Sequence, residues 1–427
     1  MRAAVLLALL FSVAPPAAAQ SDSTWRQHDR SARQAYHDGD FATVRAQLLA
    51  MRREIGPLPR IDYGLAVAEA RLGNGGRALE WLEIFADMGL WRDASHDADL
   101  ASVRDQAGYL RIAAQLAANL APIERGAVAF TLPDADLVAE DIAYDTADHR
   151  FFVSSVHRRK IIVVDSAGHV SDFTRPGADG TWAMLALAVD PARRLLWATT
   201  VALNAAEQYS AADSGRSALL AYDLATGALR ARLDPPPAPG GHSLGDMTLD
   251  PDGTVYVSDG AAGTVYRAAP GAHTLEALVP PATLLLPQTP ALSADGRRLF
   301  VPDYARGIAV IDLATRAVAW LPHPGNVALT GIDGLYRVDG TMIAIQNGPT
   351  PNRVLRVLFD DAMTRVLGAD VLERGVPVLD DPTHGVMIGD AFYFIARSGW
   401  SRVRGDGTMS PAGAGDAPVV RRMVLLH

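Results

Sequence analysis

The sequence predicts a mainly β protein: a six-bladed β-propeller preceded by a small α-helical domain. The first observation is a unit of strand, tight turn and strand that returns about six times after residue 126. The second is that most copies continue into a third strand and often a fourth, with roughly 40 to 50 residues per copy, which is typical of propeller blades. The third is helical spacing of apolar residues before residue 122. A β-sandwich is the alternative, but sandwiches rarely contain six related hairpins.

The amino terminus reads as a signal peptide over residues 1–19. Arg2 supplies a positive start, residues 4–14 are apolar but too short to span a bilayer, and Ala17-Ala18-Ala19 offers a cleavage site. We therefore expect an exported protein with no membrane span after cleavage, in the periplasm of a bacterium. The sequence contains no cysteine, which excludes disulfides, thiolate catalysis and cysteine-ligated zinc.

Residues 20–122 form the predicted helical domain. Apolar residues such as Leu65, Leu72, Leu79 and Leu82 recur at helical spacing, and glycine-containing turns separate the helices. Residues 63–85 resemble tetratricopeptide repeats. Such helix pairs either bind a protein partner or pack on a neighbouring domain, and two hairpins are few for a long binding groove, which favours packing.

Residues 127–427 form the predicted propeller, and the hairpin at residues 331–348 contains its most informative residue. Asp333 lies inside an apolar strand, where a buried carboxylate needs a compensating donor or cation. Glu140, Asp246 and Gln288 fall at or near the equivalent position of other copies. Because the innermost strand of every blade lines the central channel, we expect these four side chains to converge on one axis.

Charge argues against a nucleic-acid partner. The net charge is −9 and the sequence has no concentrated basic tract, whereas binding to a phosphate backbone calls for a basic face. Gly241-His242-Ser243-Leu244-Gly245 has the spacing Gly-x-Ser-x-Gly, but it precedes a strand of the third predicted blade instead of joining a strand to a helix, so a serine nucleophile is not indicated.

Two short motifs, Ala139-Glu140-Asp141-Ile142 and Gly331-Ile332-Asp333-Gly334, resemble the six-bladed propellers of the gluconolactonase and regucalcin, paraoxonase and strictosidine synthase superfamily. The resemblance implies one divalent cation, usually calcium, high in the channel. Its ligands would be Glu140, Asp246, Gln288 and Asp333. Gln288 and Gly245 stand where that family has asparagine, which leaves magnesium or zinc open as alternatives.

The same resemblance implies a hydrolase of lactones or esters, in which the cation polarises the carbonyl for attack by water. The candidate bases are Asp333, His384 and His242. The alternative is a non-catalytic propeller that binds a ligand or protein, which the altered ligands and the added helical domain favour. A lyase of the strictosidine synthase type would need a channel glutamate, for which Glu140 is the candidate. Trp400 is expected to pack between blades rather than to serve the site.

Overall fold

The computed structural model describes residues 24–425, so the signal peptide expected at 1–19 lies outside the described residues. The described part begins with α2 (Thr24–His37), α3 (Phe41–Ile55), α4 (Pro59–Arg71), α5 (Gly75–Asp87), the short 3₁₀ helix η1 (Ala98–Val103) and α6 (Ala107–Ala118). Within this described part, none of the helices combines the length and apolar character needed to span a bilayer.

Six four-stranded antiparallel sheets follow, which confirms the predicted six-bladed propeller within residues 24–425. Each of the first five sheets is built from four consecutive strands. They are β2 (Ala139–Asp145), β3 (Arg150–Ser155), β4 (Lys160–Val164) and β5 (Val170–Asp172); β6 (Ala183–Asp190), β7 (Leu195–Val201), β8 (Ser217–Asp223) and β9 (Leu229–Leu233); β10 (Leu244–Leu249), β11 (Val255–Asp259), β12 (Thr264–Ala268) and β13 (Glu276–Ala277); β14 (Ala291–Leu292), β15 (Arg298–Asp303), β16 (Gly307–Asp312) and β17 (Val318–Trp320); and β18 (Ile332–Val338), β19 (Thr341–Gln346), β20 (Arg353–Phe359) and β21 (Val366–Arg374).

The sixth sheet closes the ring with strands from both ends of the propeller. β22 (Gly385–Ile388), β23 (Ala391–Arg397) and β24 (Val419–Val424) are joined by β1 (Ala127–Thr131) as the outermost strand, with Ala127 opposite Arg422. A propeller closed in this way leaves no long unpaired edge between its first and last blades. The sequence did not reveal this pairing, because β1 lies before the first recognisable repeat and its partner β24 lies near the other end of the chain.

The cores lie between neighbouring sheets. Trp197 and Leu219 of the second sheet, for example, pack against Met247, Val257 and Tyr266 of the third. Successive side chains of a strand point to opposite faces of its sheet. Both faces carry apolar residues, because each blade is covered by a neighbouring blade.

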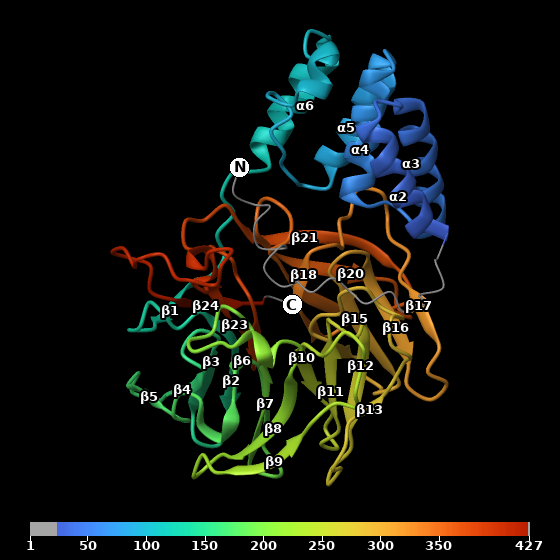
Figure 1. Cartoon of the computed structure of the whole chain (residues 1–427). Coiled ribbons are helices and arrows are strands. Elements are labelled where there is room, and N and C mark those ends of the chain that lie inside the picture. The colour runs from blue at the N-terminus through green and yellow to red at the C-terminus, as the bar shows by residue number, and fades with distance from the viewer. Residues whose placement is uncertain (1–23, 426–427) are drawn as a thin grey trace.

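The helices lie over one face of the propeller, above β18, β20 and β21 (Figure 1). Arg353, at the start of β20, joins the two parts: its Nη1 donates to the carbonyls of Met88 (2.9 Å) and Gly89 (3.1 Å), and its Nε donates to Gln346 Oε1 (2.6 Å). The Trp91 amide donates to the Thr350 carbonyl at 2.8 Å. The segment after α5 is therefore fixed to the loops at the mouth of the channel.

Candidate metal centre

Irregularities in three inner strands position the acidic side chains. The register of β2 against β3 shifts between Ala139 and Ile142. The same happens in β10 between Leu244 and Asp246, and in β18 between Ile332 and Gly334. Glu140 and Asp333 fall within such shifts, and Asp246 at the end of one. A bulge bends a strand and changes the direction of its side chains, so these residues face the channel where regular pairing would not place them.

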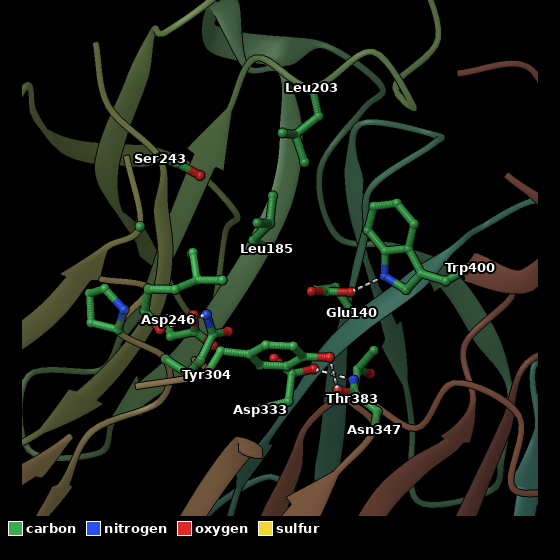
Figure 2. Close-up of a pocket in the computed structure, with 15 residues that line it drawn as sticks. Glu140, Leu185, Leu203, Ser243, Asp246, Tyr304, Asp333, Asn347, Thr383 and Trp400 are labelled. Atoms are coloured by element: carbon green, nitrogen blue, oxygen red, sulfur yellow. Dashed lines mark hydrogen bonds between the residues drawn. The ribbon is translucent and has the colours of Figure 1, made fainter. Parts of the chain in front are cut away.

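Glu140, Asp246, Gln288 and Asp333 all line one cavity at the channel, as the sequence predicts. Figure 2 shows Glu140, Asp246 and Asp333 around this cavity, together with Tyr304, Asn347 and Trp400. Gln288 contributes less than expected, because its amide Nε2 is engaged with the Leu286 carbonyl at 3.2 Å.

His384 lies buried beside the carboxylates. Its Nε2 is 2.6 Å from Asp246 Oδ1, and its Nδ1 is 2.9 Å from the Glu140 carbonyl. Burial alone would lower the pKa of His384, but the charges of Asp333, Asp246 and Asp141 raise it well above its ordinary value. Both ring nitrogens then carry protons, so in this arrangement His384 is a cationic partner of Asp246. A role of His384 as a base stays a prediction from the sequence.

Asp333 is held by a chain of hydrogen bonds. Asn347 Nδ2 donates to Asp333 Oδ2 (2.7 Å) and to the Pro382 carbonyl (2.9 Å), while Tyr304 Oη donates to Asn347 Oδ1 (2.9 Å). Burial and the charge of Asp246 raise the pKa of Asp333 to about 6, against the opposing effects of His384 and Asn347. Asp333 thus titrates close to neutral pH.

Trp400 orients Glu140, because its indole Nε1 donates to Glu140 Oε2. Burial raises the pKa of Glu140 to about 8, the charges of Asp333 and Asp246 add to this effect, and His384 opposes it. The expectation that Trp400 only packs between blades was incomplete. The sequence did offer one signal for this contact, because a buried tryptophan needs an acceptor for its indole N–H.

Asp141 is a fourth buried acid that the sequence analysis did not assign. Its carboxylate accepts the backbone N–H groups of Ile142 and Leu187, each at 2.7 Å, and so ties β2 to β6. Burial raises its pKa to about 6, and His384 opposes this shift. We interpret Asp141 as the residue that stabilises the bulge carrying Glu140.

The cluster has the composition of a cation site. Donor atoms of Asp246, Asp333 and His384 all lie within 4.8 Å of one another. Within residues 24–425, no hydrogen bond to Glu140 Oε1, Asp246 Oδ2 or Asp333 Oδ1 is observed. One imidazolium faces the four carboxyl groups of Glu140, Asp141, Asp246 and Asp333, so a cation or protons must offset the remaining charge. Carboxylate oxygens suit calcium or magnesium, and His384 would have to lose a proton to become a ligand.

His242 does not belong to this centre. It precedes β10, and its Nδ1 is held 2.7 Å from Asp259 Oδ2 at the end of β11. It lines a separate pocket with Arg216 and Trp182. Its ring lies 6.1 Å from that of Tyr266 on β12, the third strand of the blade. A role of His242 as a base stays a prediction from the sequence, and the structure places the residue outside the acidic cavity.

The chain matches no protein-family model and no curated protein sequence. It resembles the solved structure of the aldose sugar dehydrogenase of Streptomyces coelicolor, with 16% identity, 71% of this chain and 100% of that chain covered, and a TM-score of 0.47. It also resembles the gluconolactonase XC5397 of Xanthomonas campestris, with 16% identity, 71% of this chain and 96% of that chain covered, and a TM-score of 0.45. A third similar structure is the virginiamycin B lyase of Staphylococcus aureus, with 11% identity, 69% of this chain and 98% of that chain covered, and a TM-score of 0.47. At identities and scores this low, the likeness says nothing about activity, and the six-bladed architecture rests on the sheets themselves.

Proposed function

We propose that this protein is an exported, bacterial periplasmic hydrolase of lactones or esters that uses a divalent cation, calcium in the first instance. The observation that supports the proposal is the set of three carboxylates from β2, β10 and β18, each with an oxygen free toward one cavity. Glu140, Asp246 and Asp333 would hold the cation. When bound, it would polarise the scissile carbonyl and stabilise the oxyanion.

The surrounding residues have distinct tasks in this proposal. Asp333 accepts the proton of the attacking water with its carboxylate, which Asn347 orients through the hydrogen bond to Oδ2. The water oxygen forms a bond to the carbonyl carbon, the bond from that carbon to the leaving oxygen breaks, and Asp333 returns the proton to the leaving oxygen. Trp400 fixes the orientation of Glu140, and His384 fixes that of Asp246. Leu185 and Leu203 supply apolar walls that exclude water from the cavity.

A non-catalytic ligand-binding or protein-binding propeller is the second candidate. The specific observation in its favour is the pair of His384 with Asp246, which neutralises one carboxylate without any external cation. In that case the helical domain would contribute to binding a partner, and the acidic cluster would serve the fold.

The test combines metal content with hydrolysis. Purified protein is analysed for bound metal and assayed on a panel of lactones and aryl esters, with and without EDTA. Variants are Glu140→Ala and Asp333→Ala, and the control is Asp370→Asn, which removes an exposed charge on β21. We expect a stoichiometric metal and hydrolysis, both lost in the two cavity variants and kept in the control. Metal-free protein with no hydrolysis and no response of its melting temperature to calcium or EDTA would refute the hydrolase and leave the binding propeller.

A further inference from the structure

A second cleft lies where the helices meet the propeller. Residues of α2, the start of α4 and the segment after α5 form one wall, and loops at the channel mouth form the other. Leu286 and Tyr304 line both this cleft and the channel cavity that holds Glu140, Asp246 and Asp333. The two spaces therefore adjoin, and the helical domain borders the entrance to the acidic site.

Tyr304 forms the partition between the two spaces. Its hydroxyl is fixed by Asn347 on the channel side. Gly348 packs against the ring, and a Cβ at that position would lie 3.0 Å from the phenol. Both contacts hold the hydroxyl end of the ring, so Tyr304 is fixed where the channel cavity and the cleft adjoin.

The helical wall of the cleft carries an excess of positive charge. Arg33, Arg60 and Arg92 line it together with one carboxylate, Asp29. Arg33 Nε pairs with Asp29 Oδ2 at 2.9 Å, and Arg60 Nη1 pairs with Asp29 Oδ1 at 2.5 Å. A guanidinium has five N–H donors, so a single carboxylate leaves donors of both side chains available.

Arg92 is held by a different contact. Its guanidinium lies 4.2 Å from the centre of the Tyr63 ring, and Tyr63 in turn donates a hydrogen bond to Asp97 at 2.6 Å. Stacking of this kind restricts a long side chain before any ligand arrives, which lowers the entropic cost of binding. The whole protein has a net charge of −9, so a cationic wall beside an acidic channel is a local feature.

We infer that the cleft binds an anionic group of the substrate, a carboxylate or a phosphate, whose scissile carbonyl lies in the channel. This inference rests on the proposed function, because the channel supplies the reacting end. The substrate would be an ester or lactone with an oxyanion on the side away from the carbonyl. Arginine forks match the paired oxygens of carboxylates and phosphates.

The test uses ligands that need no turnover, so it separates this inference from the hydrolase. Isothermal titration calorimetry compares glutaric acid monoanilide with its uncharged primary amide and with the corresponding phosphonate. We expect an anionic anilide to bind about fivefold or more tightly than the amide at low salt, the range for partly exposed charge-assisted contacts. The preference should weaken as ionic strength rises. Whichever of the two anions binds more tightly identifies the natural group.

Variants locate the effect. Arg92→Gln and the double variant Arg33→Gln with Arg60→Gln should reduce the preference to less than about twofold. Arg53→Gln removes the same charge from an exposed position of α3 outside the cleft and should leave the preference unchanged. Equal affinity for the anionic and neutral anilides, or a preference that survives in all cleft variants, overturns the inference. An anionic preference without ester hydrolysis would instead keep the cleft and reject the hydrolase.

Discussion

Asp333→Asn should change stability in opposite directions with and without metal. In metal-free protein Asp333 is a buried carboxylate among other carboxylates, and its pKa is raised from 3.8 to about 6. A shift of about two pKa units corresponds to about 3 kcal/mol by which the charged form is disfavoured above pH 6. Asparagine has the same shape, and its Oδ1 can still accept the bond from Asn347. Removing the charge should therefore stabilise the metal-free protein by up to about 3 kcal/mol.

The melting temperature makes this measurable. For a chain of this length, 1 kcal/mol corresponds to about 1 °C, so the variant should melt about 3 °C higher than wild type in EDTA. Calcium at about 100 times its dissociation constant should add about 2.7 kcal/mol to wild type, and much less to the variant, which lacks one anionic ligand.

Differential scanning calorimetry at pH 7.5, with Asp370→Asn as the exposed control, gives both numbers. A variant that melts below wild type in EDTA would refute the reasoning, since it would show that the hydrogen-bonded carboxylate is favourable even without a cation.

Two further outcomes follow from the structure. The pKa of Glu140 is about 8 in the folded state, against an ordinary value of 4.5. Between pH 5 and 8 the folded state therefore binds more protons than the unfolded state. The free energy of unfolding should fall as pH rises through this range, by up to about 1.4 kcal/mol per pH unit from this group. Urea titrations in EDTA should show a flatter pH dependence for Glu140→Gln, and parallel curves would contradict the assignment. Arg353→Met should cost about 2–4 kcal/mol, because the carbonyls of Met88 and Gly89 lose a buried charged donor. Limited proteolysis should then cut the segment joining helices and propeller faster than in the exposed control Arg365→Met, and equal rates would show that Arg353 is not the anchor.

The propeller could be predicted because its signals are local. Asp-Gly and Asn-Gly turns and alternating side chains are written in each hairpin, and repetition identifies the blade. Glu140, Asp246 and Asp333 could be grouped for the same reason, since equivalent positions of successive blades share one axis. The sequence alone did not show that β1 completes the sixth sheet, because that pairing joins residues almost 300 positions apart.

The candidate bases show the limit of that reasoning. His384 and His242 both lie near the start of an inner strand, and the sequence does not show which acid each ring contacts. The fold places one ring against Asp246 and the other against Asp259. Trp400 and Glu140 are 260 residues apart in the chain, so the sequence alone could not show that Trp400 orients Glu140.

The amino-acid sequence by itself determined the number of blades, the helical domain before them and the acidic positions at the channel, since these depend on periodicity, turns and repetition. Tertiary structure decided which acids share a cavity, that His384 lies against them, and that the helical domain places three arginines in the cleft beside the channel. These properties depend on burial and on distances between residues far apart in the chain, because both the energy of a charge and the energy of a hydrogen bond are set by what surrounds them.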